Sequence, residues 1–329
     1  MIVVTGGAGF IGSNIVAGLQ DHGLDDLAVI DNFGMCEKWR NLSRRTLRYL
    51  VSAAEGFEFI RQHEKEVDVV IHMGAISSTT EADVDAVVRN NFTLTMSLWR
   101  FCAERGIRFI YASSAATYGA GENEFCDDDS LGYLNRLCPL NAYGWSKVMV
   151  DRAIAQEKKN GAKCPPQSVG LKFFNVYGPN EYHKGGQKSV VAHIFPDALA
   201  GRPTQLFKSY CAGYEDGGQL RDFVWVGDVV SVVLWLLEHS DVSGLFNVGS
   251  GEAKSFNLLA GVVWMTLNKQ INIQYKEMPE SLREKYQYFT QADLTKLRKA
   301  GYITPMTSLE DGVKEYVGKY LMNTKNPYR

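Results

Sequence analysis

Thr5-Gly6-Gly7-Ala8-Gly9-Phe10-Ile11-Gly12 is the stretch of sequence that decides the fold, because it follows a short apolar run and opens an amphipathic segment. Gly6 permits a tight turn, and Gly9 lets backbone N–H groups approach a pyrophosphate without a Cβ in the way. Gly12 lets a helix pack closely on the preceding strand. The start of that helix adds unsatisfied N–H groups and a positive dipole end. The stretch therefore predicts a phosphate-binding strand–loop–helix unit.

The rest of the first half alternates short apolar runs with longer amphipathic stretches, which is typical of β-α-β units. The segment Leu47–Ile60 predicts a strand near Leu47–Val51 and then a helix. The other expected strands are Met1–Val4, Leu27–Ile30, Val67–Ile71 and Phe109–Tyr111, and the expected helices are Ile11–His22 and Ala82–Arg105. We therefore expect an α/β fold: a Rossmann-type, doubly wound parallel sheet with a smaller, discontinuous α/β C-terminal domain.

After about residue 175 the pattern becomes irregular, with Gly- and Tyr-rich loops at Tyr177–Lys188 and Ser209–Gln219. Strand-like pieces return at Phe223–Val226 and Leu245–Val248. The predicted domains are a dinucleotide-binding domain, 1–174 with returning segments 221–249 and 286–300, and a substrate domain made of 175–220, 250–285 and 301–329.

Composition excludes several classes of protein. The chain has 329 residues and a formal charge of −2, which disfavours a nucleic-acid partner or an anionic membrane surface. The longest apolar stretches, such as Val229–Leu237, are too short to span a bilayer, and no signal peptide is evident. Six cysteines lack metal spacing and predict free thiols in a reducing cytoplasm. His183 and His193 also lack ligand spacing, so we expect no metal.

Asp31 ends the second expected strand, 19 residues after Gly12. A carboxylate there is placed to accept hydrogen bonds from an adenosine ribose, which turns the phosphate loop into a dinucleotide site. By itself the acid favours NAD, because it would repel a 2′-phosphate. The following basic run, Lys38, Arg40, Arg44 and Arg45, could neutralise that phosphate or could be a solvated helix face, and the residues leave both readings open.

Tyr143 and Lys147 stand four residues apart in Tyr143-Gly144-Trp145-Ser146-Lys147, on one face of an expected helix. A free tyrosine titrates near pH 10, and a neighbouring ammonium stabilises its phenolate and lowers that pKa. Ser114, in a cluster of hydroxyls at the end of an expected strand, is the candidate to hydrogen-bond the reacting substrate oxygen. The three residues together predict a nicotinamide-dependent redox centre.

These motifs together resemble the extended short-chain dehydrogenase/reductases that modify nucleotide sugars, and the likeness covers nearly the whole chain. The matching motifs are TGGAGFIGSN, the acid at Asp31, HMGA at 72–75, NN at 90–91, SSAATYG, YGWSK, FNVYGP at 174–179, RDFV at 221–224, GDV at 227–229 and FNVG at 246–249.

Within this family the chain is most similar to the branch that epimerises ADP-glycero-manno-heptose at C6, for lipopolysaccharide core. Ala115, Ala116 and Thr117 stand where the dehydratases carry an Asp-Glu pair, which disfavours 4,6-dehydration. The segments that carry the similarity are the His183-Lys184-Gly185 stretch, YQYFTQADL at 286–294 and SSTTE at 77–81.

The resemblance implies roles for individual residues. Tyr143 and Lys184 would be acid/bases on opposite sides of the sugar, Lys147 the cofactor-side partner of Tyr143, and Ser114 the support of the C6 oxygen. The implied contacts of the cofactor, NADP with NAD possible, are Gly6, Gly9, Phe10, Ile11, Gly12, Asp31, Asn32, Lys38, Met73, Gly74, Ala75, Ile76, Ser77, Asn90, Lys147, Val176 and Lys184. The implied ADP-heptose contacts are Ser114, Asn175, Gly186, His193, Phe207, Lys208, Arg221 and Tyr286. A homo-oligomer, by resemblance a homopentamer, is also implied.

Several of these assignments keep an alternative. Lys184 could be a surface lysine or a phosphate anchor, Arg221 could pair with Asp222 or Asp228, and Tyr286 could be a packed aromatic. A serine is expected to contact the sugar where Gly186 stands. The Ser209–Gln219 loop is longer than expected, and Arg48 is one possible second contact of a 2′-phosphate.

Two other functions remain open from the sequence. A UDP-hexose 4-epimerase of the same family would need one tyrosine and no second base. A non-catalytic NADP-binding sensor would need none of Tyr143, Lys147 and Ser114. The preferred reaction is a redox step that reverses itself: hydride leaves C6, the keto sugar turns its other face, and hydride returns.

Overall fold

The protein is described here by a computed structural model that covers residues 1–283 and 286–329. Its centre is a parallel sheet of seven strands in the order β10-β6-β5-β4-β1-β2-β3. The strands are β1 Ile2–Thr5, β2 Leu27–Asp31, β3 Tyr49–Ser52, β4 Val69–His72, β5 Arg108–Ser114, β6 Ser168–Phe173 and β10 Gly244–Val248. The expected Rossmann-type sheet is confirmed, including the strand and helix within 47–60.

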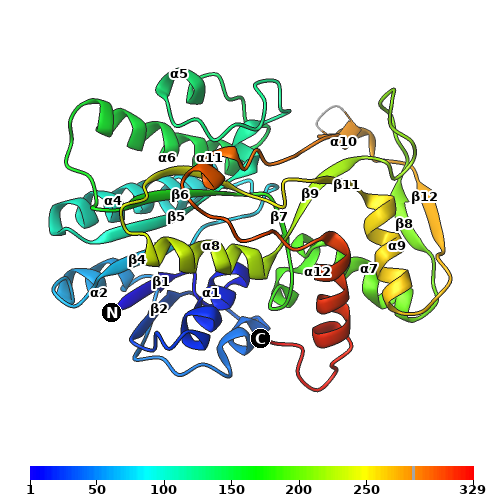
Figure 1. Ribbon diagram of the computed structural model, residues 1–329, viewed down its shortest axis with the longest axis horizontal. Helices are drawn as coiled ribbons and strands as arrows, with labels where there is room; N and C mark the ends of the chain where they lie inside the picture. The colour runs from blue at the N-terminus through cyan, green and yellow to red at the C-terminus, as the bar shows by residue number, and fades with distance from the viewer. Residues whose placement is uncertain (284–285) are drawn as a thin grey trace.

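Helices cover both faces of this sheet, with α4 and α6 on one face and α1 and α8 on the other (Figure 1). A Cβ at Gly18 would lie 2.2 Å from Val230 Cγ1, so α1 and α8 approach closely because this position is glycine. The elements of this half are α1 Phe10–Asp21, η1 Glu37–Leu42, α2 Gly56–Gln62, α3 Val84–Val87, η2 Val88–Thr93, α4 Leu94–Arg105, η3 Ala115–Tyr118, α5 Leu131–Leu134, α6 Ala142–Lys159, α8 Val226–Glu238 and α11 Thr295–Lys299.

A smaller lobe lies at the opposite end of the molecule from α2 and α4 (Figure 1). It has its own apolar core, in which Trp264, Val263 and Val313 are buried. Its sheets have the orders β11-β9-β7 and β12-β8. Its elements are β7 Asn175–Tyr177, η4 Tyr182–Gln187, α7 Val190–Leu199, β8 Thr204–Phe207, β9 Leu220–Trp225, β11 Ala253–Ser255, α9 Phe256–Thr266, β12 Ile273–Lys276, α10 Glu280–Arg283, α12 Leu309–Glu315 and η5 Tyr316–Leu321.

The two late strands of the sequence have different places. β10 closes the edge of the main sheet beside β6, whereas β9 pairs with β7 and β11 in the smaller sheet. The domain boundaries stay a prediction, and the end of the expected segment 250–285 lies outside the described residues.

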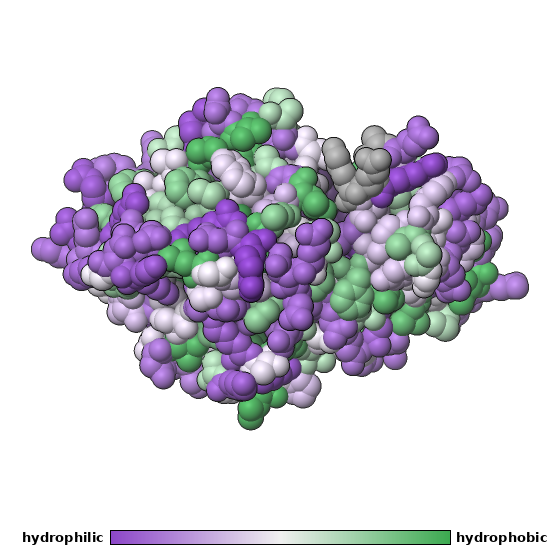
Figure 2. Space-filling view, turned by 90° about the horizontal axis from the view of Figure 1, so that it is seen from above, coloured by the Kyte–Doolittle hydropathy of each residue, from purple (hydrophilic) through white to green (hydrophobic). Residues whose placement is uncertain are grey.

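Hydrophilic residues cover most of the face in Figure 2, and hydrophobic residues appear there in small separate patches. Among the described residues, no helix is long and apolar enough to cross a membrane, and no three His, Cys, Asp or Glu side chains are grouped to hold a metal ion. The six cysteines are free thiols.

The carboxyl ends of the parallel strands meet at one edge of the sheet and place the predicted site residues there. The chain runs outward from β1 through β2 to β3 and then crosses to β4 on the other side of β1. Such a switch point leaves a crevice beyond the strand ends where ligands bind in α/β sheets. Thr5, Asp31, His72 and Ser114 all end strands at this crevice.

Candidate active site

The glycine loop after β1 has the geometry of a phosphate cradle. Gly6 has φ of +66°, and a Cβ there would lie 2.6 Å from Gly74 N. A Cβ at Gly12 would lie 2.2 Å from Gly6 O. Gly9 is the N-cap of α1 and no side chain caps that helix, so its first turn presents backbone N–H groups to the crevice. At each of the three positions a Cβ would crowd neighbouring backbone, so the loop favours glycine there, as the sequence predicts.

Asp31 holds the glycine loop in place and forms an ion pair with Lys38. Its Oδ2 accepts a hydrogen bond from the Ala8 N–H at 2.8 Å, and its Oδ1 accepts from the Lys38 ammonium. Lys38 also donates to the Asn32 carbonyl at 3.1 Å. Asp31 is 7% exposed and Lys38 is 18% exposed, so the pair lies at the wall of the crevice with its charges partly balanced.

Two other members of the basic run, Arg40 and Arg45, pair with acids other than Asp31. Arg40 pairs with Glu37, and Arg45 lies 3.6 Å from Asp21. The suggestion that Arg48 assists a 2′-phosphate is wrong, because Arg48 bonds Asp26 at 3.0 Å and Glu66 at 2.6 Å. Asp26 immediately precedes β2, so Arg48 lies at the amino end of the sheet, opposite the crevice.

A buried histidine joins the glycine loop to the next strand. The His72 ring nitrogens lie 2.6 Å from Thr5 Oγ1 and 2.9 Å from Thr95 Oγ1. Thr95 Oγ1 donates its own proton to the Asn91 carbonyl, so it accepts from His72 Nε2–H and leaves Nδ1 to accept from Thr5. Burial lowers the pKa of His72 to about 3, and the nearby Lys147 acts in the same direction. His72 is therefore a neutral structural group.

A cavity of about 200 Å³ opens beside β2 and β4, with mostly apolar walls from Phe57, Ile60, Leu94 and Leu98. An apolar slot next to the acid predicted to bind a ribose is the kind of site that suits an adenine ring. Several residues that the sequence assigned to the cofactor line it, namely Gly6, Asp31, Asn32, Lys38, Gly74, Ala75, Ile76 and Asn90.

The redox residues meet where β5 ends and α6 begins. The Asn141 side chain caps α6 by accepting from the Gly144 N–H at 2.9 Å, which places Tyr143 in the first turn and Lys147 one turn later. Partial burial raises the pKa of the Tyr143 phenol, and hydrogen bonding to Ser114 opposes that shift. Burial lowers the pKa of Lys147 to about 8, while attraction to Asp151 opposes it.

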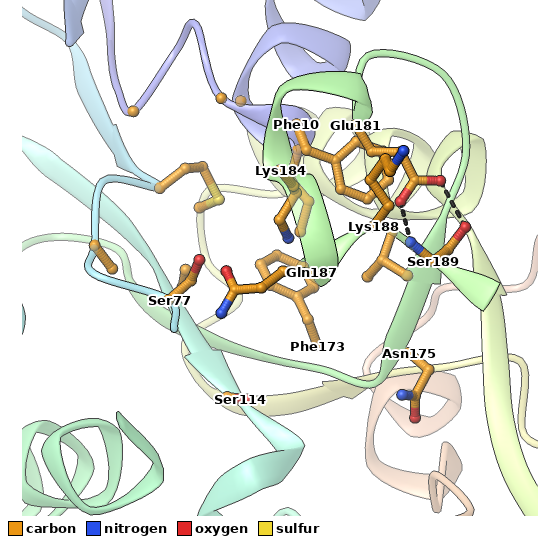
Figure 3. Close-up of a pocket in the computed structure, with 18 of the residues that line it drawn as sticks. Phe10, Ser77, Ser114, Phe173, Asn175, Glu181, Lys184, Gln187, Lys188 and Ser189 are labelled. Atoms are coloured by element: carbon orange, nitrogen blue, oxygen red, sulfur yellow. Dashed lines mark hydrogen bonds between the residues drawn. The ribbon is translucent and has the colours of Figure 1, made fainter. Parts of the chain in front are cut away.

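A larger cavity of about 460 Å³ joins the phosphate loop to these residues (Figure 3). Lys184 points into it from η4, and Ser114 lies across from it at the end of β5 (Figure 3). The predicted residues that line it are Gly6, Gly9, Phe10, Ile11, Gly12, Asp31, Lys38, Met73, Gly74, Ala75, Ser77, Ser114, Tyr143, Lys147, Asn175, Val176 and Lys184. The structure thus brings both predicted acid/bases to one cavity, on different elements.

Lys184 has a distinct environment. Burial lowers its pKa, and the carboxylate of Glu181 acts in the opposite direction. Its ammonium lies 5.6 Å from the centre of the Phe10 ring. Glu181 is 1% exposed and accepts hydrogen bonds from Ser189 (Figure 3). It also accepts one from the Tyr316 hydroxyl at 2.9 Å. This is not the setting of a free surface lysine.

Three buried asparagines fasten the chain before η4 to the phosphate loop. Asn14 Nδ2 donates to the Pro179 carbonyl at 3.0 Å. Asn41 Nδ2 donates to the carbonyls of Ala8 at 2.9 Å and Asn180 at 3.0 Å. Asn180, in the left-handed region at φ +73°, donates to Ser13 Oγ at 3.0 Å. The base of η4 is therefore anchored to the first β-α unit.

The residues predicted for the far end of the substrate do not line the large cavity. Arg221 is 8% exposed and its guanidinium lies 5.3 Å from the Tyr286 ring centre, which in turn lies 6.4 Å from the Phe207 ring centre. The alternative partners of Arg221 are engaged elsewhere: Asp222 accepts from Ser250 and Ala292, and Asp228 from Thr307. Tyr286 packs edge-on against Phe207 and Tyr288, so it is a packed aromatic in contact with a buried cation.

Three other predicted substrate residues lie at the surface. Lys208 pairs with Glu277 at 2.7 Å, and its side chain is 44% exposed. Gly186 and His193 are exposed and lie together, with His193 Nε2 3.3 Å from the Gly186 carbonyl. In the long loop after Lys208, the centre of the Tyr210 ring lies 3.8 Å from the Arg283 guanidinium carbon.

The sequence reasoning missed several residues of the large cavity. Burial lowers the pKa of His183 to about 4, and the charges of Lys38 and Lys184 add to that shift. A sequence signal for the missed residues between 181 and 189 is the polar run that follows FNVYGP, which reads Glu-Tyr-His-Lys-Gly-Gly-Gln-Lys-Ser. The missed lining residues are Ala112, Ser113, Phe173, Phe174, Glu181, His183, Gln187, Lys188, Ser189, Val190, Phe223 and Phe256.

Comparison with known proteins gives consistent relatives. Residues 2–249 match the profile described as "NAD dependent epimerase/dehydratase family". The chain is 45% identical over 329 residues to the ADP-L-glycero-D-manno-heptose-6-epimerase of Fusobacterium nucleatum subsp. nucleatum, covering 98% of each chain. The solved Helicobacter pylori ADP-L-glycero-D-manno-heptose-6-epimerase is similar with a TM-score of 0.76 and 28% identity, covering 97% of this chain and 95% of that one. Thermus thermophilus UDP-glucose 4-epimerase, solved with NAD, gives 0.75 and 26%, covering 96% and 97%.

Proposed function

Because the chain belongs to the NAD dependent epimerase/dehydratase family, we propose that it inverts C6 of ADP-glycero-manno-heptose, a step in making the heptose of lipopolysaccharide core. The observation that carries this proposal is the pairing of two ionisable groups, Tyr143 and Lys184, in one cavity from different elements. The full-length likeness to a heptose epimerase supplies the substrate. A 6-keto sugar is the intermediate of this reaction.

The residues at the crevice fit a nicotinamide dinucleotide. A Cβ at Gly6 or Gly12 would collide with the backbone of Gly74 or of Gly6 and so distort the loop proposed to cradle the pyrophosphate, and the slot beside Asp31 would take the adenine. A dinucleotide held by these residues would supply the hydride acceptor and donor for the reacting carbon of the sugar. The finer choice of NADP rests on Lys38, because its ammonium sits on Asp31 where a 2′-phosphate would otherwise meet a bare carboxylate.

On one side of the sugar, Tyr143 holds or releases the proton of the reacting hydroxyl. Ser114 lines the same cavity at the end of β5 and would orient the oxygen of that substrate hydroxyl. The Lys147 ammonium stabilises the phenolate and so lowers the cost of removing that proton at neutral pH.

On the other side, Lys184 transfers the proton after the keto sugar has turned. Burial lowers its pKa toward the range in which an amine can act as both acid and base, while Glu181 keeps the ammonium form accessible. When the keto sugar turns in the site, its reacting oxygen moves away from the group that first held its proton. Two groups on separate elements can serve the two positions of that oxygen without moving either element.

The diphosphate end of the substrate we assign to Arg221, whose fork of donors can pair two oxygens at once. Tyr286 and Phe207 would hold the adenosine beside it. Asn175 lines the large cavity and would contact the sugar. We also propose that the chain forms a homo-oligomer, a pentamer by family resemblance.

The direct test is incubation of the full chain with ADP-D-glycero-D-manno-heptose while C6 inversion is followed by NMR. We expect conversion by the unmodified protein, loss in Tyr143→Phe and in Lys184→Met, and normal conversion in Lys319→Met, which changes an exposed lysine on η5. A Lys184→Met protein that epimerises at full rate would refute the two-base reaction. Conversion of UDP-glucose but not of the heptose would favour a 4-epimerase, and no turnover with no retained cofactor would favour a sensor.

A further inference from the structure

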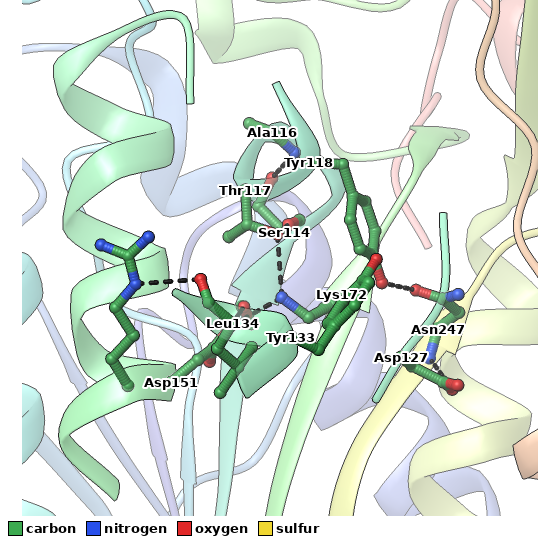
Figure 4. Close-up of polar contacts among 12 residues, drawn as sticks. Ser114, Ala116, Thr117, Tyr118, Asp127, Tyr133, Leu134, Asp151, Lys172 and Asn247 are labelled. Carbon is green, nitrogen blue, oxygen red and sulfur yellow. Dashed lines mark hydrogen bonds and ion pairs between the residues drawn. The ribbon is translucent and has the colours of Figure 1, made fainter. Parts of the chain in front are cut away.

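A fully buried ion pair lies beneath the redox residues. Lys172 on β6 and Asp151 on α6 are 2.7 Å apart, and both side chains are 0% exposed (Figure 4). Asp151 also accepts from the Tyr111 hydroxyl at 3.0 Å and the Ser113 hydroxyl at 2.8 Å. The carboxylate is therefore well satisfied, while burying two charges remains expensive.

Lys172 connects the pair to Ser114. Its ammonium donates to Thr117 Oγ1 at 2.8 Å, and Thr117 Oγ1 donates to the Ser114 carbonyl at 2.7 Å (Figure 4). Thr117 belongs to η3, the turn that follows Ser114. The same turn packs on the start of α6, since a Cβ at Gly144 would lie 2.5 Å from the Ala116 carbonyl. Lys172 thus fixes the position of the turn between Ser114 and Tyr143.

Asp151 connects the pair to Lys147. The two residues lie four apart on α6 and so share one face of the helix. Asp151 attracts the Lys147 ammonium and acts against the lowering of its pKa by burial. Lys172 competes for the same carboxylate, so the field that Asp151 exerts on Lys147 depends on how fully Lys172 balances it.

We propose that Asp151 and Lys172 are positioning residues for the reaction: Asp151 holds Lys147 in its charged form, and Lys172 moderates that effect while fixing the turn that carries Ser114. This inference rests on the proposed function, because it gives the pair a role through Ser114, Tyr143 and Lys147. A purely apolar pair of this size would pack as well or better, so stability alone does not account for two buried charges here.

Other ionisable groups around the pair are accounted for. Tyr111 on β5 and Tyr118 on η3 are buried, and burial raises the pKa of each. The Tyr118 ring centre lies 5.0 Å from the Lys172 ammonium, and its hydroxyl donates to Asn247 Oδ1 at 2.6 Å. Asp129, Lys158 and Asp151 together line a cavity of about 150 Å³. Of these residues, Tyr111 alone hydrogen-bonds the Asp151 carboxylate, and it remains neutral.

The test compares variants of the full chain in the heptose assay from about pH 6 to about pH 10. In Asp151→Asn we expect the alkaline limb of kcat to move about one unit to lower pH, because Lys147 loses its attracting carboxylate. In Lys172→Met we expect the limb to move to higher pH, because Asp151 is no longer balanced, and kcat to fall about tenfold with KM nearly unchanged. Lys172→Arg keeps the charge and restores most of kcat.

Glu157→Gln is the matched control, since it removes a carboxylate from the same helix in an exposed pair with Arg100. The Glu157→Gln variant should leave the alkaline limb of kcat where it is in the unmodified protein. A second measurement, made without substrate, separates this inference from the proposed function. The tyrosinate absorbance of each variant is followed against pH, and that of the same variant carrying Tyr143→Phe is subtracted, which leaves the titration of Tyr143. If the unmodified protein fails to epimerise the heptose, the proposed function fails while this titration still reports on the pair.

The inference would be overturned if the alkaline limb of kcat stayed in place in both single variants and only their melting temperatures fell. It would also be overturned if the limb moved in the same direction in both. If either single variant fails to fold, the double variant Asp151→Leu/Lys172→Met leaves no unpaired buried charge. Normal kcat and an unchanged pH profile in that double variant would equally overturn it.

Discussion

Replacing Lys38 with methionine tests the cofactor choice, because Lys38 pairs with Asp31, the acid proposed to bind the adenosine ribose. Lys38 bonds Asp31 Oδ1 and the Asn32 carbonyl, and its side chain is 18% exposed. Methionine has a similar length and removes the charge alone. Asp31 keeps its bond from the Ala8 N–H at 2.8 Å, so the phosphate loop should hold its shape.

The magnitude follows from the contact that is lost. A hydrogen bond between charged groups contributes about 1.5–3 kcal/mol, and the variant also leaves Asp31 to repel a 2′-phosphate. The Kd of NADPH should therefore rise about 10- to 150-fold. The Kd of NADH should change little, because its ribose hydroxyls hydrogen-bond the carboxylate that Lys38 vacates.

The assay is a fluorescence titration of each reduced cofactor into protein stripped of bound nucleotide, at fixed ionic strength because such contacts are screened by salt. Lys319→Met serves as the control for loss of one exposed positive charge. Equal weakening of NADPH and NADH, or tighter NADH binding by the unmodified protein, would refute the assignment of Lys38 to a 2′-phosphate.

Three further predictions follow from other contacts. Gly12→Ala places a Cβ 2.2 Å from the Gly6 carbonyl, so the purified variant should retain little cofactor, measured by absorbance after denaturation, while circular dichroism shows a normal fold; full retention would contradict the steric argument. Glu181→Gln removes the charge that opposes the lowered pKa of Lys184, so the apparent pKa of Lys184 in the pH profile of kcat should fall by about one unit, and a rise would contradict it. Burial raises the pKa of Asp228 above 3.8, so its contribution to stability is full below that pH and is lost as pH rises through the folded-state pKa. The difference in unfolding free energy between the unmodified protein and Asp228→Asn, from urea melts at several pH values, should therefore shrink from about pH 4 to pH 7, and a growing difference would show the opposite sign.

The sequence predicts the first half of the fold well because its signals are local. The loop at Gly6–Gly12, the acid at Asp31 and the pair Tyr143 and Lys147 are each defined by neighbours within one strand–loop–helix unit. Parallel strands bring such units to a common edge, so residues far apart in sequence assemble without further information.

The rest of the site depends on contacts between distant segments, which spacing does not reveal. In the sequence, Arg48 looks like one more cation of a basic run. In the structure it precedes β3 and bonds Asp26 at the amino end of the sheet, away from the crevice. Strand β9 reads as a continuation of the main sheet and instead pairs with β7 and β11, because pairing partners are a tertiary choice. Glu181 gives no local sign that Tyr316, 135 residues later, will bond it.

The anchoring of η4 by Asn14, Asn41 and Asn180 bears on how Lys184 is held between the two lobes. These bonds tie the base of η4 to the first β-α unit, while Glu181 ties it to Ser189 at the start of α7 and to Tyr316 on η5. Arg221 on β9 and Phe207 on β8 lie in the same smaller lobe as η4. The proposed second acid/base therefore stands on an element that joins the two lobes, and its distance from Tyr143 depends on contacts made by both of them. A substitution that breaks either set of hydrogen bonds should disturb the spacing of the two proposed proton-transfer groups.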